Sequence, residues 1–116
     1  MTTIGIVGAG IAGLHLALYL QKHGVPVTLY TDRSPDEVRR GRLPATVALM
    51  GATRDRDAAL GTNHWDGHGT PAIRVRVTGD PPLVLTGALT QPFLFIDMRV
   101  YLPRLMEDFE ARWGSW

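Results

Sequence analysis

The stretch "TIGIVGAGIAGLHLALYLQK" (residues 3–22) changes its hydrophobic period at three glycines. Before them, residues 3–7 form a short apolar run, typical of a strand buried on both faces of a parallel sheet. After them, apolar residues recur at helical spacing, and Gly24 is expected to end the helix. The run "VPVTLYT" (residues 25–31) predicts a second strand. The sequence therefore predicts a β-α-β unit with parallel strands.

The glycines Gly8, Gly10 and Gly13 match G-x-G-x-x-G in the place where that motif is informative, between a strand and a helix. Gly8 would permit a sharp turn, Gly10 would let a pyrophosphate approach the backbone, and Gly13 would let the helix pack closely. The helix N-terminus would then bind the phosphates. The alternative is that the glycines only form a tight turn. The combination of strand, glycines, helix and second strand favours a dinucleotide site.

The end of the second strand is where an acidic residue usually binds the ribose of a dinucleotide. Thr31 stands at that position, and Asp32 follows one residue later. Asp32 is a candidate for the ribose and Arg33 for a phosphate, with a solvated turn as the alternative. Arg42 and Arg56 are further candidates for the pyrophosphate, because a guanidinium group can donate two hydrogen bonds to a phosphate. Each of these two is otherwise a surface charge.

The remainder of the chain has weaker patterns. Residues 32–41 predict a loop with a helical turn that begins after Ser34, whereas residues 42–60 have a mixed pattern that assigns no element. The runs "AIRVRV" (72–77) and "LVLTGAL" (83–89) alternate and predict an antiparallel hairpin with one face in water.

The last segment carries a helical apolar stripe, with Asp97 as its N-cap and Gly114 at its end. Pro103 lies within the stripe, so the helix is expected to start near Val100 or to be kinked there.

Composition narrows the classes of function. The chain has 116 residues, 45% of them hydrophobic, which suits one soluble globular domain. A formal net charge of +1 argues against nucleic acid and membrane partners. The absence of cysteine excludes disulfides and thiolate chemistry, and we expect a cytoplasmic protein. His64 and His68 lie in a glycine-rich loop without a third ligand, so no metal site is expected. No catalytic residue can be assigned.

Five segments together resemble the flavoprotein subunit of the styrene and indole monooxygenases, which are FAD-dependent two-component enzymes. They are "IGIVGAGIAGLHLALYL", "VTLYTDRSPDE", "RLPATVA", "RDRDAALGTNHW" and "IDMRVYLPRLMEDFEARWG". The resemblance implies that a separate NADH-dependent flavin reductase supplies reduced FAD. The flavoprotein uses this FAD and O₂ to epoxidise a small aromatic alkene or indole. Because the cofactor carries the oxygen transfer, the protein would mainly bind, orient and exclude water.

The resemblance also implies positions for the cofactor. The backbone from Gly8 to Gly13 would hold the pyrophosphate, Asp32 and Arg33 would lie near the adenosine, and the segment from Arg42 to Ala45 would follow the flavin. The complete set of cofactor-binding candidates is Gly8, Ala9, Gly10, Ile11, Ala12, Gly13, Asp32, Arg33, Arg42, Leu43, Ala45, Arg56 and Arg99.

The expected fold class is α/β: a Rossmann-like, FAD-binding β-α-β unit, an antiparallel hairpin and a C-terminal helix. Residues 1–60 would form the FAD-binding unit, residues 61–96 the start of a substrate domain, and residues 97–116 a helix that returns to the FAD domain. The family's subunit is several times longer, so we expect an incomplete domain with an open sheet that another chain would cover. Two alternatives remain: an NAD(P)- or FAD-binding interaction module without catalysis, and an NAD(P)-dependent reductase.

Overall fold

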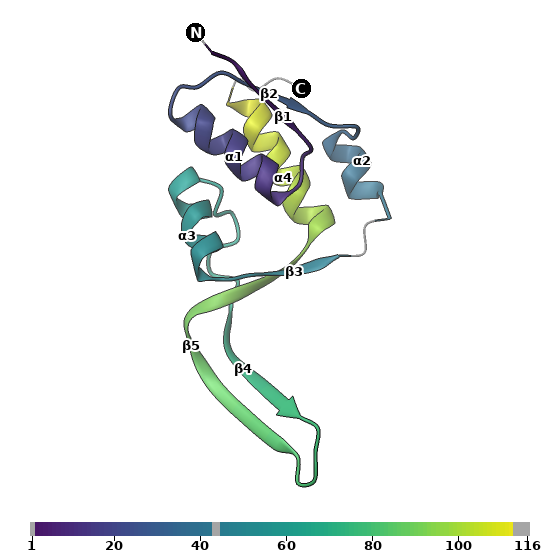
Figure 1. The fold of residues 1–116 in the computed structure, drawn as a ribbon, viewed down its shortest axis with the longest axis vertical. Helices are drawn as coiled ribbons and strands as arrows, with labels where there is room; N and C mark the ends of the chain where they lie inside the picture. Colours follow the sequence, from purple (N-terminus) through teal and green to yellow (C-terminus); the bar gives the residue numbers. More distant parts are fainter. Residues whose placement is uncertain (1, 43–44, 113–116) are drawn as a thin grey trace.

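The computed structural model describes residues 2–42 and 45–112, which form a helical body from which a β-hairpin projects (Figure 1). Two sheets are present, a parallel pair β1-β2 and an antiparallel sheet with the order β3-β5-β4. The elements are β1 (Ile4–Val7), α1 (Ile11–Lys22), β2 (Val27–Tyr30), α2 (Pro35–Arg40), β3 (Thr46–Leu49), α3 (Gly51–Leu60), β4 (Thr70–Val77), β5 (Leu83–Asp97) and α4 (Met98–Ala111).

The predicted β-α-β unit is confirmed, with strands shorter than the apolar runs that predicted them. Strand β1 pairs in parallel with β2 from Ile4↔Val27 to Val7↔Tyr30. Helix α1 connects the two strands and is followed by Gly24, whose φ of +75° lies in the left-handed region. The glycine therefore ends the helix as the sequence predicted.

The prediction that the first strand is buried on both faces is wrong. Ile6 and Leu29 join the core, but Val7 is 89% exposed and its strand partner Tyr30 is 55% exposed. Among the described residues, packing covers only one side of the β1-β2 sheet. The other side of this sheet presents apolar surface to solvent.

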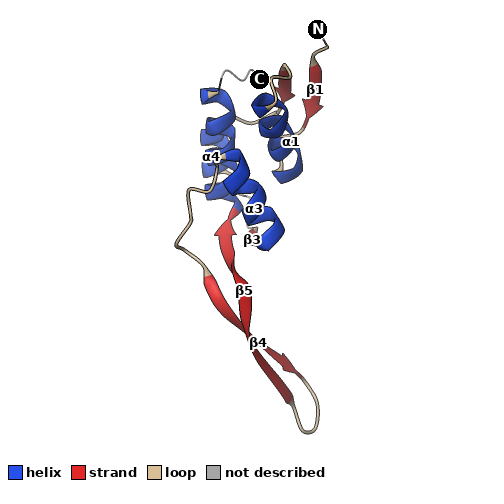
Figure 2. Ribbon diagram, turned by 90° about the vertical axis from the view of Figure 1, so that its left-hand side faces the viewer, coloured by secondary structure: helices blue, strands red, loops and turns tan. Residues whose placement is uncertain are grey.

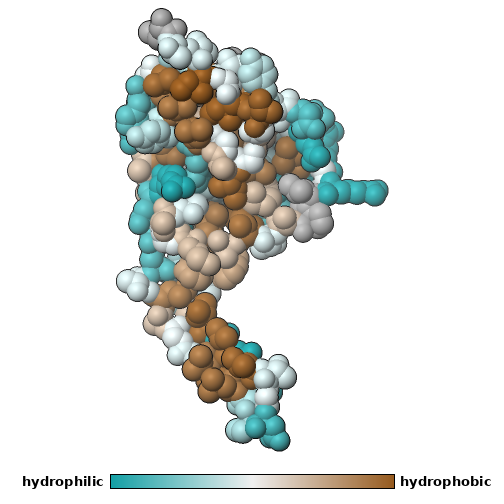
Figure 3. Space-filling view, viewed as in Figure 1, coloured by the Kyte–Doolittle hydropathy of each residue, from teal (hydrophilic) through white to brown (hydrophobic). Residues whose placement is uncertain are grey.

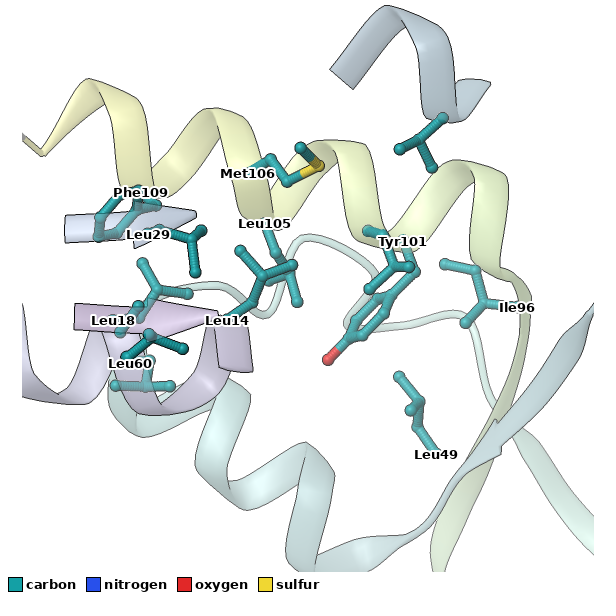
Figure 4. Close-up of a cluster of buried hydrophobic side chains, with 14 of the residues drawn as sticks. Leu14, Leu18, Leu29, Leu49, Leu60, Ile96, Tyr101, Leu105, Met106 and Phe109 are labelled. Carbon is teal, nitrogen blue, oxygen red and sulfur yellow. The ribbon is translucent and has the colours of Figure 1, made fainter. Parts of the chain in front are cut away.

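The core lies between α1, α4 and the inner side of the parallel sheet, and Figure 4 shows its side chains converging from these elements. Tyr101 and Phe109 of α4 are its largest members and are fully buried. The remaining hydrophobic side chains that are less than 2% exposed are Leu14, Ala17, Leu18, Leu29, Leu105 and Met106. The buried side chains of α4 recur at helical spacing, so they form the apolar stripe that was visible in the sequence of the last segment.

Helix α4 begins at Met98, two residues before the predicted start near Val100. The Asp97 carboxylate accepts a hydrogen bond from the backbone N–H of Arg99 at 2.8 Å, so the predicted cap is confirmed. Pro103 is buried inside the helix rather than at its start. The predicted end at Gly114 lies outside the described residues.

The helical turn predicted after Ser34 is helix α2, which a capping box begins. The Ser34 hydroxyl accepts from the N–H of Glu37 at 3.1 Å, and the Glu37 carboxylate accepts from the N–H of Ser34 at 3.2 Å. Pro35 occupies the first turn, where its missing N–H costs nothing.

We predict that Ser34→Ala lowers the free energy of unfolding by about 1 kcal/mol, because an N-cap hydroxyl satisfies a backbone donor that alanine leaves unpaired. Urea unfolding followed by circular dichroism measures the change. Thr78→Ala, in the exposed turn of the hairpin, serves as the control and should change the midpoint by much less. Equal effects of the two substitutions would contradict the capping role.

Residues 42–60, which the sequence left unassigned, contain β3 and α3. Strand β3 pairs with the last part of β5, from Thr46↔Asp97 to Leu49↔Leu94. Helix α3 buries only Asp57 and Leu60. Helix α3 has almost no apolar face, so the sequence did not predict it.

The predicted hairpin is confirmed as β4 and β5. Strand β5 is longer than predicted: it has 15 residues and ends where α4 begins. The hairpin extends away from the body, which Figures 1 and 2 show from two directions. The radius of gyration is accordingly 17.2 Å, against about 13 Å for a compact chain of this length. One face of the hairpin was predicted to lie in water; both faces do, because every residue from 71 to 88 is exposed.

Candidate functional site

The first glycine of the motif turns the chain from β1 toward α1. Gly8 has a φ of +102°, in the region that favours glycine, and its N–H donates to the Tyr30 carbonyl oxygen at 2.8 Å. This bond joins the end of β1 to the end of β2. The two loops that follow the strands are thereby held at the same edge of the sheet.

The third glycine lets α1 pack against that turn. A Cβ on Gly13 would overlap the carbonyl oxygen of Gly8 and would lie 3.5 Å from Cγ2 of Ile6. Gly13 is thus required by the close approach of helix and loop.

The second glycine has a different surrounding. A Cβ placed on Gly10 would meet no heavy atom within 4 Å, although Gly10 is the N-cap of α1. No side chain caps the helix at Gly10, and its first turn contains no acidic residue. The open space above Gly10 therefore lies at a helix end whose partial positive charge attracts anions.

A shallow hollow connects this turn with the end of β2. It is lined by Val7, Gly8, Ala9, Tyr30, Thr31 and Asp32. Of the predicted site residues, the structure thus brings Gly8, Ala9 and Asp32 together. The Asp32 side chain is 89% exposed, and Arg33 Nε lies 4.0 Å from it. The Thr31 hydroxyl oxygen accepts from the N–H of Arg33 at 3.3 Å, which fixes the turn that carries both charges.

A second concavity, the groove between α1 and α3, begins at the same helix end. Ile11 and Ala12 line it from α1, and Arg56 lines it from α3. Arg56 is therefore the predicted arginine that shares a surface with the first turn of α1.

The other predicted residues lie elsewhere. Arg42 and Ala45 are exposed between α2 and β3, and Leu43 lies outside the described residues. The Ala45 carbonyl oxygen accepts from the N–H of Met98 at 2.9 Å, so this segment lies beside the start of α4. Within the described residues, neither Arg42 nor Ala45 lines the hollow beside Gly8.

Arg99 lines a separate cavity with Arg39, His64, Trp65 and Arg104. Its Nη2 lies 2.7 Å from Asp97 Oδ2, and its Nε donates to the same carboxylate at 3.2 Å. These hydrogen bonds lower the pKa of the Asp97 carboxyl and raise the pKa of the Arg99 guanidinium. Arg99 is exposed and Asp97 is half-buried, so this ion pair has little effect on stability.

Sequence reasoning missed a buried polar cluster that joins α1, α3 and α4: His15, Asp57, Thr62 and Tyr101. His15 Nε2 lies 3.0 Å from Asp57 Oδ1, and the hydroxyls of Tyr101 and Thr62 each donate to that carboxylate at 2.8 Å. Burial, and secondarily the Asp57 charge, raises the pKa of Tyr101. His15 is 3% exposed. No sequence signal linked it to Asp57, because 42 positions separate them.

Within the described ranges, no group of three metal-ligating side chains is present. His64 Nε2 instead lies 2.6 Å from Asp108 Oδ2. Over the same part of the chain, the helices are too short or too polar to cross a bilayer.

One family model matches the part of the chain that contains the glycine turn. A family model described as an NAD(P)-binding Rossmann-like domain matches residues 6–35. This range contains the turn, helix α1, strand β2 and the Asp32 loop.

Three curated proteins extend the comparison. The chain is 47% identical over 114 residues to styrene monooxygenase StyA of Pseudomonas fluorescens, and 46% identical to the StyA of a Pseudomonas species. Each match covers 97% of this chain but 28% of the relative. A probable FAD-dependent monooxygenase of Arthroderma benhamiae is 54% identical over 37 residues, which are 32% of this chain and 8% of that protein. The resemblance to the styrene monooxygenase flavoprotein is thus confirmed, and the chain spans between a quarter and a third of the length of these StyA relatives.

Proposed function

We propose that this chain is the FAD-binding part of a styrene-monooxygenase-like flavoprotein. The observation that carries the proposal is the open space above Gly10, at a helix end without a side-chain cap and beside the hollow that contains Asp32. A diphosphate fits that place because it is anionic and needs backbone donors without an intervening side chain. The name of the Arthroderma benhamiae relative, a probable FAD-dependent monooxygenase, then favours FAD among the dinucleotides.

The candidate residues lie in two places, beside the glycine turn and beside the start of α4. The backbone of Gly8 to Gly13, with Arg56 across the groove, would hold the diphosphate, and Asp32 with Arg33 would bind the adenosine side. Arg42 and Ala45 would lie toward the flavin. Arg99, at the start of α4 close to Ala45, would lie near the cofactor on that side.

When bound and reduced, FAD supplies the oxygen-transfer chemistry that an aromatic alkene or indole requires. The described residues bind and orient it, and we assign none of them as an acid or base. We propose that a NADH-dependent flavin reductase is the partner that reduces the flavin. We further propose that the substrate domain starts within residues 61–96. A chain without cysteine fits a reducing compartment, and we place the protein in the cytoplasm.

A binding experiment tests the proposal. The purified chain is titrated separately with FAD, FMN, NADH and NADPH, with flavin fluorescence and isothermal calorimetry as readouts. FAD should bind at least tenfold more tightly than FMN, because FMN lacks the second phosphate and the adenosine. Equal binding of FAD and FMN would contradict the proposed diphosphate site.

The same titration separates the second candidate, an NAD(P)-binding module. The family model that matches residues 6–35 favours it, because its description names NAD(P). Tighter binding of NADPH than of FAD would establish this candidate and overturn the first.

We predict that Asp32→Asn weakens FAD binding about tenfold, because a charged acceptor for the ribose hydroxyls becomes a neutral one. Asp80→Asn, at the exposed hairpin turn, removes the same charge far from the hollow and is the control. Calorimetric titration of both variants measures the difference. Unchanged FAD affinity in Asp32→Asn would remove Asp32 from the site.

A further inference from the structure

The outer part of the hairpin, residues 72–77 of β4 and 83–88 of β5, is exposed on both faces. A two-stranded hairpin without a third strand or a helix against it is marginally stable in water. The outer hairpin therefore has the features of a segment that another polypeptide covers.

The strand register gives the outer hairpin two different faces. The pairs Val75↔Leu85 and Val77↔Leu83 lie on one face, together with Ile73. These five side chains, called here the apolar face, are between 37% and 54% exposed. The opposite face carries Arg74, Arg76, Val84 and Thr86. Figure 3 shows hydrophobic surface gathered on the projecting arm.

This alternation is typical of a sheet with one face packed and one face solvated. Neither Arg74 nor Arg76 forms an ion pair with a described residue, which agrees with their side of the hairpin remaining in water. The apolar face is thus the side that a partner would cover.

The area of the apolar face indicates what kind of partner could cover it. Five side chains at this exposure offer on the order of 400 Å², about half of the ~800 Å² per partner that a specific interface needs. A second copy stacked on this face alone would bury too little. A larger polypeptide could also cover the second exposed apolar surface, around Val7 and Tyr30 at the opposite end of the molecule.

We propose that the apolar face docks against a polypeptide equivalent to the part of the StyA relatives that this chain does not match. The match covers 28% of those relatives and includes the entire hairpin, so most of their length lies outside it. The proposal rests on the proposed function, since it takes this chain to be part of such a flavoprotein.

Cysteine labelling tests the docking, because the chain has no cysteine of its own. Leu85→Cys and Val84→Cys form a matched pair: they are adjacent, 54% and 49% exposed, and on opposite faces. Each variant is prepared twice, as the chain alone and as a chimera in which the chain replaces the matched segment of Pseudomonas fluorescens StyA. Peptide mass spectrometry measures the rate of maleimide labelling at each site. Only chimeras that unfold cooperatively on heating are used, because these are folded.

In the chain alone, both variants should label at similar rates. In the chimera, Leu85→Cys should label at least tenfold more slowly, and Val84→Cys should keep its rate. Equal rapid labelling in the folded chimera would overturn the proposal. Concentration-dependent protection of Leu85→Cys in the chain alone would also overturn it, in favour of a second copy. Labelling needs no flavin, so a chimera that protects Leu85→Cys but does not bind FAD would contradict only the proposed function.

Discussion

Replacing Asp57 by alanine is expected to lower the free energy of unfolding by about 4 kcal/mol, close to the whole stability of a marginal domain. The carboxylate accepts from the hydroxyls of Tyr101 and Thr62 and lies 3.0 Å from His15 Nε2. All four residues are buried. Removal of the carboxylate leaves His15 and Tyr101 only each other, at 2.9 Å, and leaves Thr62 only the carbonyl oxygen of residue 57, at 3.3 Å. Buried polar groups from three segments thus lose hydrogen bonds, which destabilises the fold.

Urea unfolding by circular dichroism measures this loss, with Asp55→Ala as the control. Asp55 lies on the same helix, is exposed, and accepts a hydrogen bond from Gln91 at 3.1 Å. Its replacement should cost less than about 1 kcal/mol. Tyr101→Phe, which removes one of the donors, should fall between the two variants. If Asp57→Ala unfolds at the same urea concentration as Asp55→Ala, the cluster does not stabilise the fold.

The parts of the fold that were predictable from sequence are those with a local signal. The β-α-β unit was readable because the hydrophobic period changes at Gly8 to Gly13 and a second apolar run follows within helix-crossover distance. The caps at Ser34 and Asp97 were readable because capping depends on residues within three positions of each other.

The parts that were not predictable depend on distant residues. Helix α3 is held by the Asp57 cluster and by Leu60 rather than by an apolar stripe, so its sequence has no helical period. The exposure of both hairpin faces also escaped prediction, because alternation indicates which side of a strand is apolar and not whether anything covers it. The exposed side of the parallel sheet at Val7 agrees instead with the open sheet expected for an incomplete domain.

The candidate site, too, was only partly predictable from sequence. The glycine turn and its neighbour Asp32 were predicted from sequence, and the structure places them around one hollow. Arg56 was chosen for the chemistry of its guanidinium group, and Arg99 was chosen from the family resemblance. Of these, Arg56 lies beside the first turn of α1, whereas Arg99 lines a separate cavity.

Gly13→Ala is expected to abolish measurable FAD binding and to lower the free energy of unfolding by about 3 kcal/mol. The added methyl group would overlap the Gly8 carbonyl oxygen, which is backbone and cannot rotate away. Helix α1 must then move away from the turn. This displaces the N–H groups proposed to bind the diphosphate and disturbs the packing of Leu14 in the core.

Gly10→Ala should weaken FAD binding without destabilising the fold. Gly10 has a φ of −82° that alanine adopts readily, and its added methyl group meets no protein atom within 4 Å. The free energy of unfolding should therefore change by less than about 1 kcal/mol. FAD affinity should still fall at least tenfold, because the methyl group would occupy the place proposed for the diphosphate. Calorimetric titration and urea unfolding of the two variants measure both quantities. If Gly10→Ala binds FAD as the parent chain does, the diphosphate does not approach this turn.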